Sequence, residues 1–85
     1  MKDNSSKIRV KLHMTFPENL IKEPVVSRLI KETEVEVNIR RANVDEHVGW
    51  MICELVGDDG QIENSLAWLA SAGVEVNRLG DVVES

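Results

Sequence analysis

The feature that most constrains the fold of this 85-residue chain is the strict alternation of polar and apolar side chains over residues 7 to 14. Its apolar positions are Ile8, Val10, Leu12 and Met14, and its polar positions are Lys7, Arg9, Lys11 and His13. Successive side chains of a strand point to opposite faces, so this period of two predicts a strand with one buried face. A chain of this length has room for a single hydrophobic core, which every other element must share.

The next segments alternate between helical and strand periods. Residues 24 to 32 are predicted to form a helix, because Pro24 suits a first helical position and apolar residues follow at helical spacing. Residues 16 to 23 form the loop or distorted turn before it. Residues 34 to 42 alternate again and predict a second strand, followed by a polar loop over 43–49 and an apolar strand over 50–56.

The last third of the chain carries the clearest helix signal. Asp58 and Gln61 have the spacing of a capping box, and the apolar stripe of Ile62, Leu66 and Leu69 ends at Gly73. Residues 74 to 79 then alternate as a final strand. We therefore expect one domain over residues 7–79, a disordered segment over 1–6 and a frayed tail over 80–85.

The order strand, helix, strand, strand, helix, strand predicts an α+β, ferredoxin-like fold with a four-stranded antiparallel sheet and both helices on one face. The first and third strands would be central. The predicted core comprises Ile8, Val10, Leu12, Val26, Leu29, Val35, Val37, Met51, Cys53, Leu55, Ile62, Leu66 and Leu69. The opposite face would carry Lys7, Arg9, Lys11, His13, Asn38, Arg40, Trp50, Ile52, Glu54, Val56, Glu75, Asn77 and Leu79.

Composition argues against several functions. The net charge of −5 opposes binding to nucleic acid or anionic lipid, and no apolar run reaches the roughly 20 residues of a membrane helix. The polar first residues and the single Cys53 favour a cytoplasmic protein without disulfides. We find no set of catalytic residues, so we expect no enzyme activity and no cofactor. We also expect no metal site, because His13 and His47 lie on different elements without further ligands at close spacing. Cys53 alternates in phase with Met51 and Leu55 as a core residue.

Several stretches in order resemble the NIL domain family. They are Phe16-Pro17, residues 23–26 (EPVV), residues 35–39 (VEVNI), Gly49, Glu54-Leu55, residues 67–69 (AWL) and residues 73–76 (GVEV). The resemblance covers residues 8 to 79. The resemblance implies a regulatory domain of the kind found at the end of bacterial methionine-importer ATPases. In those importers the domain forms a dimer with a second copy of itself and binds methionine. Asn38 matches the asparagine that lines the family's ligand site, whereas Arg40 stands where the family usually has leucine.

Two functions follow as hypotheses. In the first, a homodimer binds a small amino acid such as methionine through Asn38, Arg40, Trp50 and Ile52, with Asn38 and Trp50 as neighbours on the exposed face. In the second, the free face is an adaptor surface for a transporter or ferredoxin component. The residues also permit simpler interpretations: Asn38 as an edge-strand amide bonded to water, Trp50 as a packing residue, and Arg40 and Arg41 as ion-pair partners of Glu36, Asp45 or Glu54.

Overall fold

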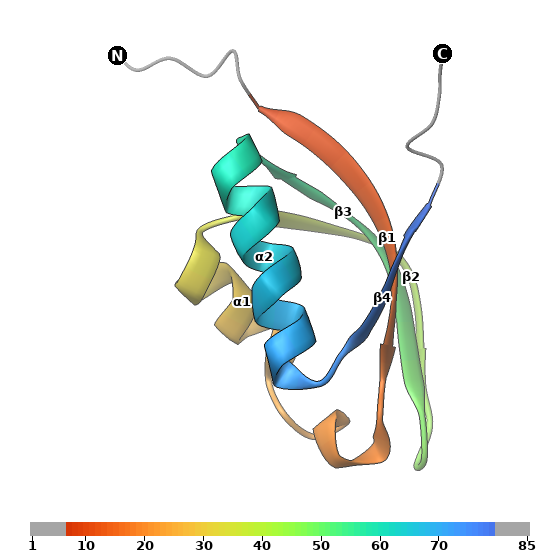
Figure 1. Ribbon diagram of the computed structural model, residues 1–85. Helices are drawn as coiled ribbons and strands as arrows, with labels where there is room; N and C mark the ends of the chain where they lie inside the picture. The colour runs from red at the N-terminus through yellow and green to blue at the C-terminus, as the bar shows by residue number, and fades with distance from the viewer. Residues whose placement is uncertain (1–6, 80–85) are drawn as a thin grey trace.

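The computed structural model describes residues 7–79 as a four-stranded antiparallel sheet covered by two helices (Figure 1). Its elements are β1 (Ile8–Phe16), a short 3-10 helix η1 (Glu18–Leu20), α1 (Val25–Thr33), β2 (Glu36–Val44), β3 (Gly49–Gly57), α2 (Asp59–Ala72) and β4 (Glu75–Leu79). The strand order is β2-β3-β1-β4, so β1 and β3 are central. Both helices lie on one face of the sheet. The predicted fold is confirmed; residues 1–6 and 80–85, predicted to be disordered and frayed, lie outside the described residues.

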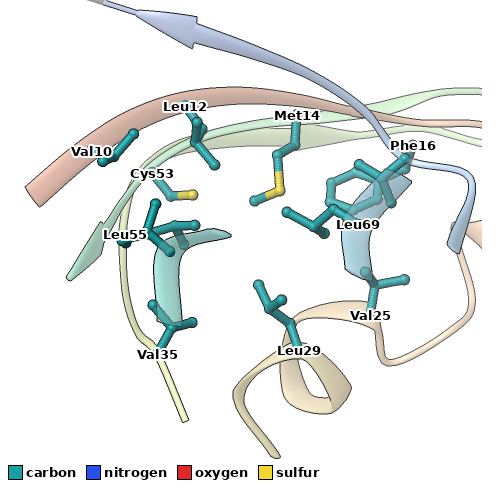
Figure 2. Packing of buried hydrophobic residues seen from close by; sticks show 12 residues of the cluster. Val10, Leu12, Met14, Phe16, Val25, Leu29, Val35, Cys53, Leu55 and Leu69 are labelled. Carbon is teal, nitrogen blue, oxygen red and sulfur yellow. The ribbon is translucent and has the colours of Figure 1, made fainter. Parts of the chain in front are cut away.

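The core lies between the sheet and the helices, and its phase on the strands is the predicted one. Alternate residues of β1, from Val10 to Phe16, point toward α1 and α2 (Figure 2). Lys11, on the other face of the same strand, is exposed. Most of the predicted core is buried, and Val37, Met51 and Leu66 pack against it with partial exposure.

The core prediction is wrong for two residues, Ile8 and Val26. Ile8 is 39% exposed, because its partner across the ladder is Gly57, which has no side chain to cover it. Val26 is only partly buried, and Val25 takes its place in the core. The reason lies in the helix geometry: Val25, Leu29 and Thr33 are spaced four residues apart and form the stripe that faces the sheet.

A buried polar contact joins the two helices and sets the end of α1. The Thr33 hydroxyl donates to the Leu29 carbonyl oxygen at 2.8 Å, and the Ser65 hydroxyl lies 3.1 Å from the Thr33 hydroxyl. Glu34 follows in the left-handed region with φ 61°. This turn explains why β2 begins at Glu36, two residues later than the alternation predicts.

The start of α2 is as predicted. The Asp58 carboxylate accepts a hydrogen bond from the Gln61 amide at 2.8 Å, and the Gln61 side-chain oxygen accepts one from the Asp58 amide at 2.9 Å. Gly73 ends the helix with φ 97°, a conformation that glycine adopts without steric cost.

The hairpin between β2 and β3 is shorter than predicted. β2 extends to Val44, and Asp45 closes the turn by accepting hydrogen bonds from the amides of His47 and Val48 at 2.8 and 2.9 Å. Within β2 the register shifts between Ile39 and Arg41, so that Arg40 forms a β-bulge. Ile39 remains 56% exposed on this edge strand.

Candidate ligand-binding face of the sheet

The face of the sheet that points away from the helices, here called the free face, is made of four cross-strand rows, which include the predicted site residues Asn38, Trp50 and Ile52. From the hairpin end these rows are Asn43, Trp50, Thr15 and Glu75; Arg41, Ile52, His13 and Asn77; Asn38, Glu54, Lys11 and Leu79; and Glu36, Val56 and Arg9. The prediction of which residues share this face is thus confirmed for the residues in these rows, except that Arg41, and not the predicted Arg40, is paired with Ile52 after the register shift in β2.

A carboxylate between two arginines forms the centre of the free face. Arg9 Nη1 donates to Glu54 Oε1 at 3.0 Å, and Arg40 Nη1 donates to Glu54 Oε2 at 2.9 Å. The Glu54 side chain is only 12% exposed, although it lies on the side without helices. The hydrogen bond from Arg9 holds the pKa of Glu54 below its usual range; the charges of Arg40, Arg9 and Lys11 act in the same direction, and desolvation opposes them.

Beside this carboxylate lies an open hollow of about 490 Å³, lined by Lys11, Arg40, Arg41, Ile52 and Leu79. Its floor is apolar, because Ile52 and Leu79 lie on either side of β1. Its rim is cationic. Within residues 7–79, Lys11 and Arg41 form no ion pair, whereas Arg40 is held by Glu54. Two cations without an ion pair among the described residues, next to apolar side chains, are complementary to a small organic carboxylate.

The β-bulge explains why two consecutive arginines reach this hollow. In a regular strand Arg40 and Arg41 would point to opposite faces. Here Arg41 pairs with Ile52 on the free face, while Arg40 reaches Glu54 on that same face. Both arginines therefore line the hollow.

Of the four predicted site residues, the hollow brings together two. Arg40 and Ile52 line it, and Asn38 lies directly opposite Glu54 in the adjoining row. The side-chain nitrogen of Asn38 is 3.5 Å from Glu36 Oε2. Trp50 lies at the hairpin end, four residues along β3 from Glu54, which is roughly 13 Å in an extended strand.

The expectation that Asn38 and Trp50 are neighbours is wrong. An antiparallel hairpin pairs residues at similar distances from its turn, and Trp50 lies next to the turn whereas Asn38 does not. Trp50 is opposite Asn43 and stacks on His13, with ring centroids 5.7 Å apart and an angle of 13° between the ring planes. Sequence reasoning also missed Lys11, Arg41 and Leu79 as parts of one hollow.

Other candidate chemistry has a structural explanation. Cys53 is fully buried in the core, and burial, together with the charge of Glu54, raises the pKa of its thiol to about 11. Among the described residues no group of three or more histidine, cysteine, aspartate or glutamate side chains has the arrangement to hold a metal ion. No helix over residues 7–79 is both long enough and apolar enough to cross a membrane.

Comparison with known proteins identifies the family and supports the fold. Residues 10–78 match the family model of the NIL domain. The chain belongs to the NIL domain family. This NIL domain is 37% identical over 65 residues to methionine import ATP-binding protein MetN 2 of Acinetobacter baylyi, an alignment that covers 72% of this chain and 19% of the relative. It therefore spans about a fifth of the length of the methionine import relatives that it matches.

Similar domains also occur in other proteins. This NIL domain is 36% identical over 64 residues to the iron-sulfur subunit of L-aspartate semialdehyde sulfurtransferase of Methanocaldococcus jannaschii, covering 75% of this chain and 48% of that subunit. It is 32% identical over 69 residues to an uncharacterized protein of Synechocystis sp., covering 79% and 71%. Its fold matches the crystal structure of the C-terminal domain of an ABC transporter ATP-binding protein from Enterococcus faecalis, with a TM-score of 0.73, 23% identity and 86% of each chain covered.

Proposed function

We propose that this NIL domain is a non-catalytic regulatory module that binds a small amino acid, with methionine as the first candidate, on the free face of its sheet. The observation that carries the proposal is the hollow in which Lys11 and Arg41 border the apolar side chains of Ile52 and Leu79. Its volume of about 490 Å³ lies within the range of small-molecule sites. The names of the methionine import relatives supply the first ligand to test.

In this proposal each part of the ligand has its own contact on the free face. The α-carboxylate lies against Arg41 and Lys11, which have no ion-pair partner among residues 7–79. The ligand's side chain lies on Ile52. Asn38, which offers both a donor and an acceptor, faces the ligand's polar groups from the adjoining row. Arg40 keeps its position through Glu54. Trp50 does not line the hollow and lies one row beyond Ile52, toward the hairpin end.

The openness of this face motivates the second part of the proposal, a homodimer. A small-molecule site usually buries most of its ligand, and a single flat sheet face does not. A second copy placed over the free face covers the ligand and the half-buried side chains of Trp50, Ile52 and Val56. Light scattering tests this part: a dimer supports it, and a monomer at high micromolar concentration contradicts it.

A thermal-shift screen with the common amino acids tests the ligand directly. A ligand that binds only the folded state adds about 2.7 kcal/mol of stability at 100 times its dissociation constant, so a true ligand raises the melting temperature. Arg41→Ala should reduce the shift by about half or more at the same ligand concentration, and Lys31→Ala, the same kind of charge removal on exposed α1, should preserve it. The absence of a shift with every amino acid contradicts the proposal.

One observation favours a second function, that of an adaptor for a transport or redox protein. The similar domain in Methanocaldococcus jannaschii is part of a protein named as an iron-sulfur subunit, and not of an importer. In this alternative the free face contacts another protein component. A thermal-shift screen in which no amino acid raises the melting temperature, together with a monomer in solution, would favour this alternative.

A further inference from the structure

An apolar groove lies at the other side of the sheet, between the start of α1 and the hairpin end of β2 and β3. It has a volume of about 240 Å³, and its walls include Phe16, Ile21, Val25, Val26, Val44 and Met51. Val44 is 59% exposed, and the neighbouring hairpin residue Val48 is 43% exposed. The groove therefore continues into an apolar surface that no described residue covers.

Acidic side chains surround one end of this groove. A second, wider hollow shares Ile21 and Glu23 with the groove, and it is also lined by Glu18, Asp45 and Glu46. Lys22 is the one cation among the described residues that line this hollow. Arg28, outside the hollow, forms an ion pair with Glu23, with 3.3 Å between Arg28 Nη1 and Glu23 Oε1. Hydrogen bonds from the amides of Val48 and His47 hold the pKa of Asp45 below its usual range, so this carboxylate stays ionised. We call these four carboxylates the acidic rim.

The acidic rim and the groove meet because η1 and the β2–β3 hairpin lie at the same end of the molecule (Figure 1). His47 Nδ1 on the hairpin is 3.4 Å from Glu18 Oε2 on η1, which confirms that the two segments are adjacent. The basic hollow on the free face is lined by other residues and lies on the opposite face of the sheet. The groove is therefore a separate surface.

We infer that this groove docks a basic peptide segment of a partner protein, which inserts one apolar side chain between α1 and the hairpin and places flanking lysine or arginine side chains against the acidic rim. The groove is too small for a typical organic ligand, because its volume of about 240 Å³ is below the usual range of small-molecule sites. This volume suits a single side chain. The acidic rim favours lysine or arginine beside that apolar side chain of the peptide, since interfaces pair surfaces of opposite potential.

Blocked pentapeptides test the inference by titration into the isotope-labelled full chain, followed through backbone amide NMR shifts. The probe has one leucine between two pairs of lysines; one control replaces leucine with serine, and another replaces the lysines with glutamates. We expect saturable shifts at residues 16–28 and 44–51 with the probe, and binding about tenfold weaker or absent with either control. Shifts confined to the free face, or equal binding of the glutamate peptide, would overturn the inference.

Matched variants locate the contact. Val44→Asn places a polar group in the groove wall and should weaken binding of the lysine peptide about tenfold. Ile39→Asn makes a similar change at an exposed position of β2 outside the groove and should not weaken it. Glu46→Lys should weaken binding more than Glu63→Lys, which makes the same charge change on the exposed surface of α2. Equal effects within both pairs would show a non-specific attraction to an acidic protein and contradict the docking site. Because these residues are not those of the proposed amino-acid site, either site can fail while the other stands.

Discussion

Arg40 Nη1 contacts Glu54 Oε2 at 2.9 Å across the β2–β3 ladder, and Arg9 Nη1 contacts the other carboxylate oxygen at 3.0 Å. One carboxylate thus neutralises part of a basic surface and fixes two arginines on an open sheet face. This arrangement leaves Lys11 and Arg41, the other cations around the hollow, free of ion pairs with the described residues. The arginine–glutamate contact therefore organises the proposed binding site without filling it.

The first prediction concerns the pH dependence that Glu54 confers. Its pKa is lowered in the folded state, so its contribution to stability is present above the ordinary carboxylate pKa and is lost as pH falls through the lowered value. Glu54→Gln should lower the melting temperature at pH 7 and show a weaker decline in acid than the parent. Exposed Glu36→Gln is the control. Parallel acid profiles of the parent and Glu54→Gln would contradict the ion-pair account.

The second prediction concerns the core. Leu69 has no exposed surface and packs between α2 and the sheet, so Leu69→Ala should reduce the free energy of unfolding by about 2 to 5 kcal/mol. Ile39→Ala, at a 56% exposed position on the edge strand, should change it by less than about 0.5 kcal/mol. Urea titrations measure both values. A large loss with Ile39→Ala would show that a partner, such as a second copy, covers this edge.

The third prediction concerns the start of α2. Asp58→Ala removes the acceptor for the Gln61 amide and should cost about 1 kcal/mol of stability. Asp59→Ala, in the first turn but without a capping hydrogen bond, should cost less. Chemical unfolding of the two variants compares them. If Asp59→Ala is the more destabilising, the capping box does not determine where the helix begins.

The fourth prediction concerns Cys53. Burial raises the pKa of its thiol to about 11, so the native protein should resist a thiol-specific disulfide reagent at pH 8 and react fully when unfolded in urea. The raised pKa also means that its contribution to stability is lost as pH rises from the ordinary thiol range toward 11. Rapid labelling of the native protein would contradict the described core.

The sequence predicts the fold well because the alternation of apolar residues on three strands records which face is buried. The ordered matches to the NIL domain also indicate the family, which the comparison confirms. Asp58 and Gln61 identify the start of α2 because a capping box depends only on local spacing. These features involve contacts between residues close in sequence or a period repeated along one element.

The site is less accessible to sequence reasoning because it depends on pairing between strands. Residues 40–43 are polar or small, so no apolar period reveals the bulge at Arg40 that brings Arg41 to the free face. The distance between Asn38 and Trp50 depends on the same ladder. Lys11 and Leu79 join the hollow because β4 pairs with β1, a contact between the two ends of the described chain.

The most direct test of the proposed function is an NMR titration of the isotope-labelled protein with methionine, compared among the parent, Asn38→Ala and Arg41→Ala. The account predicts saturable shifts at Lys11, Arg41, Ile52 and Glu54 in the parent. Each variant should remain folded and lose about 1.5 to 3 kcal/mol of binding free energy, the range for hydrogen bonds to charged groups. If methionine and the other amino acids leave these four amides unchanged, or if both variants bind as tightly as the parent, the free face is not an amino-acid site.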